Sequence, residues 1–139
     1  MRIHKYRAWD KKKKCMSYGN FMWHLTFDGI VRDTEGKEAK QIIPLEYTGL
    51  KDRNNVEIYE GDLVEKYKWD DMGHSQRLII VEVIFYRPDR EFGSFLFKEI
   101  KVLKRFEGNE RMMMEEIYRV SKEDKVIGNI YENPKLLKK

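Results

Sequence analysis

Four consecutive lysines, Lys11–Lys14, form the longest run of like charge in the chain, and aromatic residues lie on both sides of it. Lysine side chains bind phosphates as positive point charges, and nucleic-acid bases stack on exposed aromatic rings. The candidate nucleic-acid-binding residues are therefore Lys11, Lys12, Lys13, Lys14, Trp9 and Tyr18. The alternative interpretation is a solubilising hairpin turn whose aromatic neighbours belong to the core.

One cysteine and three histidines are the other candidates for chemistry: Cys15, His4, His24 and His74. No two histidines stand three or four residues apart, which is the spacing that places two metal ligands on one element. The lysines before Cys15 would activate its thiol only if they crowded it, and lysines in a turn normally point into water. We therefore predict neither a metal site nor a catalytic cysteine.

Acidic residues gather at Glu57, Glu60 and Asp62. A hydrolase that uses two carboxylates needs them about 5 to 9.5 Å apart. The segment Glu60-Gly61-Asp62 is more typical of a turn whose aspartate accepts hydrogen bonds from backbone N–H groups. Glycine-rich phosphate loops are absent from the sequence. We therefore predict no catalytic residue and no cofactor. An enzyme whose site is not recognisable in the sequence stays open as an alternative.

Alternation with a period of two dominates the chain and predicts strands. In residues 78–86 the odd positions are all apolar. Pro44 predicts either that the segment 41–49 lies at a sheet edge or that its strand begins after the proline. A polar loop is predicted for residues 32–39, and a single short helix for Glu110–Val120, from its apolar spacing. The predicted strands are residues 3–10, 15–18, 21–27, 61–67, 78–86, 94–106 and 126–131.

Length and composition set the class of protein. A chain of 139 residues predicts one domain, 1–139, within which residues 1–40 are the candidate for an N-terminal hairpin subdomain. The lone cysteine fits the reducing cytoplasm, and we expect neither a secretory signal nor a membrane span. The fold class predicted is mainly β (α+β at most): a strongly bent sheet or SH3-like barrel over residues 47–131, with an N-terminal aromatic hairpin and the short helix. A net charge of +4 is mildly basic.

Three segments, in this order and spacing, resemble the YopX family of phage and prophage proteins. They are His4–Lys11, Tyr47–Val64 and Val126–Pro134. The resemblance implies a protein encoded by a phage or prophage, acting in the host cytoplasm, with a β-rich fold that includes a small barrel. It implies no reaction and no catalytic residues.

We therefore expect an accessory protein that acts by binding. The expected partner is another protein or a further copy of the chain in a homo-oligomer, and nucleic acid is the alternative partner. We expect no small-molecule cofactor and no membrane association.

Overall fold

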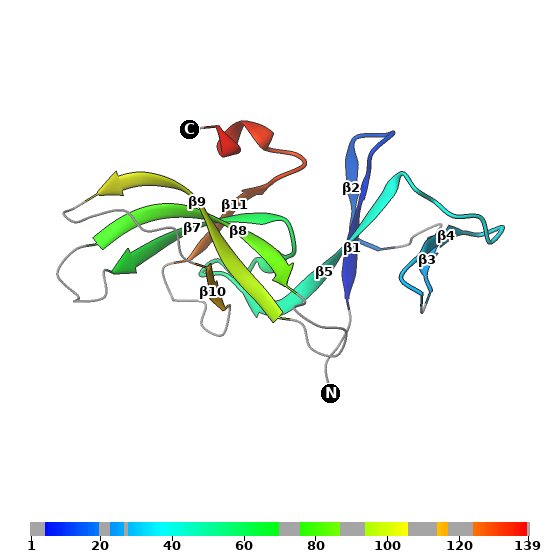
Figure 1. Cartoon of the computed structure of the whole chain (residues 1–139), viewed down its shortest axis with the longest axis horizontal. Coiled ribbons are helices and arrows are strands. Elements are labelled where there is room, and N and C mark those ends of the chain that lie inside the picture. The colour runs from blue at the N-terminus through cyan, green and yellow to red at the C-terminus, as the bar shows by residue number, and fades with distance from the viewer. Residues whose placement is uncertain are drawn as a thin grey trace. The chain divides into compact units, whose positions relative to one another are not determined.

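The computed structural model (Figure 1) describes residues 5–19, 23–26, 28–69, 76–86, 94–105, 114–116 and 124–138. These residues are mainly β-strand, which confirms the predicted fold class. The chain forms two compact units, Met1–Tyr47 and Thr48–Lys139, which we call the N-terminal unit and the C-terminal unit. Within the described residues, no helix has the length and apolar character that crossing a membrane requires.

The N-terminal unit is built on three antiparallel strands in the order β2-β1-β5. Strand β1 (Tyr6–Asp10) lies in the centre, β2 (Cys15–Ser17) returns beside it, and β5 (Ile42–Lys51) pairs with its other edge before running into the C-terminal unit. This arrangement contains the predicted N-terminal aromatic hairpin. The three middle residues of β1 are buried.

Pro44 lies inside β5, opposite Ala8 of β1. The Tyr47 N–H donates to the Lys5 carbonyl and the Lys11 N–H donates to the Gln41 carbonyl, so hydrogen-bonded pairs occur at every second position between them. The pair of Ala8 and Pro44 falls on a non-hydrogen-bonded position. The N–H that proline lacks would therefore point away from β1, and the pairing with β1 loses nothing. Strand β5 accordingly begins before the proline.

A second hairpin joins β3 (Trp23–Leu25) to β4 (Val31–Asp33), with Trp23 directly opposite Asp33. The strand predicted at 21–27 is confirmed for residues 23–25; residues 21, 22 and 27 lie outside the described part of the chain. The loop predicted for 32–39 is wrong at Arg32 and Asp33, which belong to β4. Both residues are polar, and the prediction therefore assigned them to a loop. A strand of a two-stranded ribbon can carry polar residues, because the ribbon does not need two apolar faces.

The C-terminal unit contains a five-stranded antiparallel sheet in the order β10-β9-β8-β7-β11. At two places β9 has one residue more than the facing part of β8, and such bulges bend a strand and increase its twist. The sheet is strongly curled, as the long ribbons of β8 and β9 show (Figure 1). Its strands are β7 (Asp62–Trp69), β8 (Gln76–Tyr86), β9 (Ser94–Arg105), β10 (Met114–Glu116) and β11 (Lys125–Asn129), and the short β6 (Glu57–Tyr59) pairs with β5.

A buried apolar cluster lies on one face of the curled sheet. It includes Ile79, Val81 and Val83 of β8, as the alternation predicts, and Phe85 packs against it. The Phe85 and Phe95 ring centroids are 4.8 Å apart. The buried cluster consists of Ile58, Val64, Ile79, Val81, Val83, Phe95 and Phe97.

A tight turn at Gly61-Asp62 begins β7. Gly61 has φ of 84°, a conformation that favours glycine, and a Cβ there would meet the Tyr131 ring at 3.3 Å. The buried Asp62 carboxylate accepts a hydrogen bond from the Tyr59 N–H at 2.8 Å. The turn predicted for this acidic segment is therefore confirmed, and Asp62 stabilises the backbone of the turn through the Tyr59 N–H.

The predicted helix at Glu110–Val120 is wrong in the part that the structure describes. Met114–Glu116 is strand β10, which pairs with Leu96–Lys98 of β9. The prediction rested on apolar residues at helical spacing. Pairing with the edge of β9 satisfies the backbone N–H and C=O groups that a helix would otherwise pair internally. The helical element among the described residues is the 3₁₀ turn η1 (Pro134–Leu137), which begins at a proline.

A buried ion pair lies among the described residues of the C-terminal unit. The Nζ atom of Lys66 lies 3.2 Å from Oδ2 of Asp124, and the Asp124 side chain is fully buried. The same Nζ atom lies 4.7 Å from the centroid of the Phe97 ring, where the face of the ring attracts a cation. Each charge is thus held by the other, with the Lys66 side chain 11% exposed.

Removing one partner leaves the other charge buried without its counterion. We expect Asp124→Ala to lower the free energy of unfolding by about 3 to 5 kcal/mol, measured by urea denaturation. A matched double variant, Lys66→Met with Asp124→Leu, removes both charges and is expected to recover most of that loss. A loss below about 1 kcal/mol in the single variant, the size typical of exposed pairs, would contradict a structural role for the pair.

Glu82 of β8 is half-buried opposite Leu63 and Lys98. Burial raises the pKa of its carboxyl above the ordinary value of 4.5, and the nearby Lys98 charge offsets part of the effect. The folded protein therefore holds this proton more tightly than the unfolded chain does. Stability from this group is present at low pH and is lost as the pH rises above 4.5.

Glu82→Gln removes the charge that burial disfavours. We expect the variant to be more stable than the natural protein at pH 7 and the difference to vanish as the pH falls below 4.5. Thermal unfolding measured across this pH range checks the sign. A variant that is less stable than the natural protein at pH 7 would show that the Lys98 charge outweighs burial.

Candidate functional site

The four lysines of the N-terminal hairpin all lie in water, in a turn that the backbone holds firmly. Oδ1 of Asp10 accepts hydrogen bonds from the N–H groups of Lys12 and Lys13, at 2.9 and 3.0 Å. The Lys14 N–H donates to the Asp10 carbonyl at 2.8 Å, and Lys14 adopts φ of 55°. We call Lys11–Lys14 the basic turn. Its four positive charges are exposed at one end of the hairpin.

Strand alternation divides the hairpin into two faces. Directly opposed residues share a face, so Ala8 lies beside Ser17, and Asp10 lies between Cys15 and Ile42. These five side chains form one face of the three-stranded sheet.

Trp9, opposite Met16 and Ile43, lies on the other face. There Trp9 is only 7% exposed, and a base could not reach its ring. Tyr18 is 61% exposed, and its ring lies 6.0 Å from the guanidinium of Arg7, which shares the parity of Trp9. Of the two aromatic candidates, Trp9 is therefore a core residue. Tyr18 is accessible, but it lies on the same face of the sheet as Trp9.

A cavity of about 300 Å³ lies over the face that carries Ala8 and Asp10. Trp23 and Asp33, the opposed pair of the β3–β4 hairpin, line it as well, so the cavity has one aromatic side chain beside both polar and aliphatic groups. We call it the N-terminal pocket. Lys13 of the basic turn also lines it, so the two features form one continuous site. The lining residues are Ala8, Asp10, Lys13, Cys15, Ser17, Trp23, Asp33, Ala39, Gln41 and Ile42.

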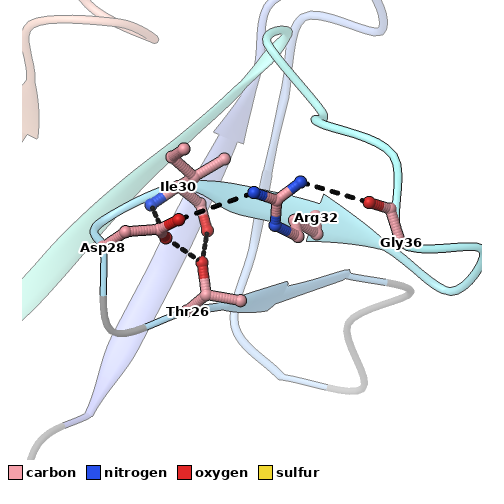
Figure 2. Close-up of polar contacts among 5 residues, drawn as sticks. All are labelled: Thr26, Asp28, Ile30, Arg32 and Gly36. Carbon is pink, nitrogen blue, oxygen red and sulfur yellow. Dashed lines mark hydrogen bonds and ion pairs between the residues drawn. The ribbon is translucent and has the colours of Figure 1, made fainter.

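The β3–β4 hairpin that carries Trp23 is closed by a polar network (Figure 2). The Thr26 hydroxyl bonds to the Asp28 carboxylate and, at 2.8 Å, to the Ile30 carbonyl, and the Ile30 N–H donates back to Asp28. The hydrogen bond from Thr26 is the main reason why the pKa of Asp28 lies below its ordinary value. Arg32 bridges Asp28 and the Gly36 carbonyl, so the network ties the two turns that flank β4.

The two carboxylates of the pocket are held in place by similar turns. Oδ1 of Asp33 accepts hydrogen bonds from the N–H groups of Glu35 and Lys37, at 2.9 and 3.0 Å, just as Oδ1 of Asp10 does in the basic turn. Within the described part of the chain, Oδ2 takes part in none of these bonds in either residue. Each carboxylate is thus fixed by one of its oxygens.

The distribution of charge between the units is uneven. The N-terminal unit holds ten lysines and arginines against six acidic residues, whereas the C-terminal unit holds eighteen of each. The whole formal net charge of +4 therefore lies in the N-terminal unit. A mildly basic chain is in fact a neutral unit joined to a basic one.

The sequence also singled out three histidines, Cys15 and the acidic residues beside Gly61. His24 and Cys15 are exposed, and His4 and His74 lie outside the described residues. Among the residues described, no three histidine, cysteine or acidic side chains are grouped as metal ligands would be. The hydroxyl of Tyr59 donates to Glu57 at 2.8 Å. What sequence reasoning missed is the pocket, because Trp23, Asp33 and Gln41 approach Asp10 only through the packing of two hairpins.

Comparison with known proteins gives a consistent result. A crystal structure of protein EF1440 from Enterococcus faecalis is similar with a TM-score of 0.57, covering 99% of this chain and all of that one. At 24% identity, this likeness supports the fold alone. No curated protein matches the chain. The family model described as YopX protein matches residues 5–138, nearly the whole length, and the chain therefore belongs to the YopX family.

Proposed function

We propose that this protein is a non-enzymatic binding protein and that its N-terminal unit binds single-stranded nucleic acid. The observation that carries the proposal is the continuous site in which the exposed basic turn meets a pocket containing Trp23. Membership of the YopX family supports the proposal that the protein comes from a phage or prophage and acts in the host cytoplasm. Catalysis has no support from the groups that line the site, since both of its carboxylates serve in turns.

Electrostatics favours a polyanion as the partner of this unit. Four exposed lysines on one short turn can contact several phosphates of one strand, and each contact releases condensed counterions. Because the lysine turn is short and the pocket holds only about 300 Å³, a flexible single strand fits the site better than a rigid duplex does.

Removing the charge of the basic turn tests the proposal. We expect Lys11→Gln, Lys12→Gln, Lys13→Gln and Lys14→Gln together to weaken binding of oligonucleotides of about 12 nucleotides, a length within the site sizes of small barrels. Since each phosphate contact on a single strand contributes about 0.7, the slope of log affinity against log salt should become shallower by up to about 3. Fluorescence anisotropy at about 50 to 200 mM salt measures both quantities.

The control removes the same charge elsewhere. Lys40, Lys51, Lys135 and Lys138 are exposed and lie outside the basic turn, so changing these four to glutamine should leave most of the affinity intact. Equal losses in the two variants would mean that net charge alone attracts the strand. No binding of DNA or RNA by the natural protein at low salt would refute the proposal.

Homo-oligomeric assembly is the second candidate function. Strand β2 stands at the end of its sheet, and the exposed ring of Tyr18 follows it directly. A strand at an edge presents backbone groups that a second copy can pair with. We expect light scattering at micromolar concentration to give a defined oligomer if β2 serves in this way. Met16→Pro should dissociate it, because Met16 occupies the non-hydrogen-bonded pair with Trp9 and its N–H points away from β1. A monomer at every concentration would contradict assembly.

A further inference from the structure

We infer that the N-terminal pocket takes one unstacked base of the bound strand, with Trp23 as its stacking surface and the basic turn holding the adjacent phosphates. This inference rests on the proposed function and goes beyond it. Binding by the lysines alone would depend on the sugar–phosphate backbone, whereas a base in the pocket makes binding depend on which base is present.

The size of the pocket suits a single base. Cavities that enclose small molecules begin at roughly 300 Å³, and this one is about 300 Å³. The cavity therefore has room for a small planar group and none for a duplex, whose bases remain paired. A base must leave its stack to enter, which selects single-stranded nucleic acid.

The arrangement of charge in the site matches a nucleotide in a particular orientation. Asp10 and Asp33 place carboxylates inside the pocket, whereas the other three lysines of the basic turn lie outside the lining. Two carboxylates repel a phosphate and accept hydrogen bonds from amino groups. A nucleotide meets both demands when its base points inward and its phosphate points toward the lysines.

The register of the β3–β4 hairpin places an aromatic face next to an acceptor. Trp23 and Asp33 are directly opposed and line the same cavity, so their side chains are neighbours. A base stacked on the Trp23 ring would lie within reach of the carboxylate of Asp33. Ser17 and Gln41, also in the lining, supply a hydroxyl and an amide. This set favours bases with an exocyclic amino group (adenine, cytosine and guanine) over thymine and uracil.

The test separates contacts to the base from contacts to the backbone. The probes are labelled homopolymers of deoxycytidine, deoxyadenosine and thymidine, their RNA counterparts, and an abasic oligomer of the same length. We expect the natural protein to bind the cytosine and adenine strands most tightly, then thymine, and the abasic strand least. Trp23→Ala should weaken binding of the cytosine strand by about 5- to 100-fold, the range of base–aromatic stacking, and leave the abasic strand unaffected.

Two further variants serve as controls. Tyr18→Ala removes an exposed ring on the opposite face of the hairpin and should not alter the preference for bases. Trp23→Phe keeps an aromatic face and should restore much of the affinity that Trp23→Ala loses. Thermal unfolding of each variant shows whether the unit is still folded.

The outcomes distinguish the inference from the proposal on which it rests. If abasic and natural strands bind equally while the lysine variant still loses affinity, the pocket takes no base and only the electrostatic proposal stands. If Trp23→Ala weakens all strands alike, including the abasic one, the inference is also overturned. If no strand binds the natural protein at low salt, both fail together.

Discussion

The alternation of side chains along β1 is the constraint on which the N-terminal unit depends. As the central strand, β1 is paired on both sides, so its register fixes the direction of every side chain beside it. Ala8 and Asp10 point to the face that carries the pocket, while Arg7 and Trp9 point to the other. A slip of one residue would bring Trp9 into the pocket and send Asp10 out of it.

The same constraint explains how a small unit can be both folded and basic. Asp10 is the last residue of β1, and its carboxylate holds the backbone of Lys12 and Lys13. One residue therefore shapes the pocket and orders the turn that carries the positive charge. The C-terminal unit uses charge differently, since its ion pair between Lys66 and Asp124 lies in the core and is neutral overall.

Much of this fold could be predicted from sequence, because alternation and turn residues act locally. The N-terminal hairpin, the apolar face of β8 and the turn at Gly61-Asp62 follow from patterns within a few residues. The short strand β10 did not, since its pairing with β9 outweighs the helical spacing of Met112, Met113 and Ile117. Strand β4 escaped prediction because Arg32 and Asp33 are polar.

The site could be predicted only in part, and for a physical reason. Lys11–Lys14 are recognisable because four like charges in a row must lie in water. Which tryptophan lines a site depends on strand pairing: Trp9 and Trp23 both occupy alternating segments, yet pairing buries the first and places the second in the pocket. The contribution of Asp33 requires the packing of two hairpins, which no local pattern encodes.

The central claim is that one face of the N-terminal unit binds a single strand through the basic turn and the pocket together. Titration of the ¹⁵N-labelled protein with a cytosine oligonucleotide, followed by NMR, tests this claim most directly. We expect the changes to concentrate at the amides of Lys11–Lys14, Ser17 and Asp33 and at the indole N–H of Trp23. Changes spread over the C-terminal unit, or centred on Tyr18 with Trp23 unaffected, would contradict it.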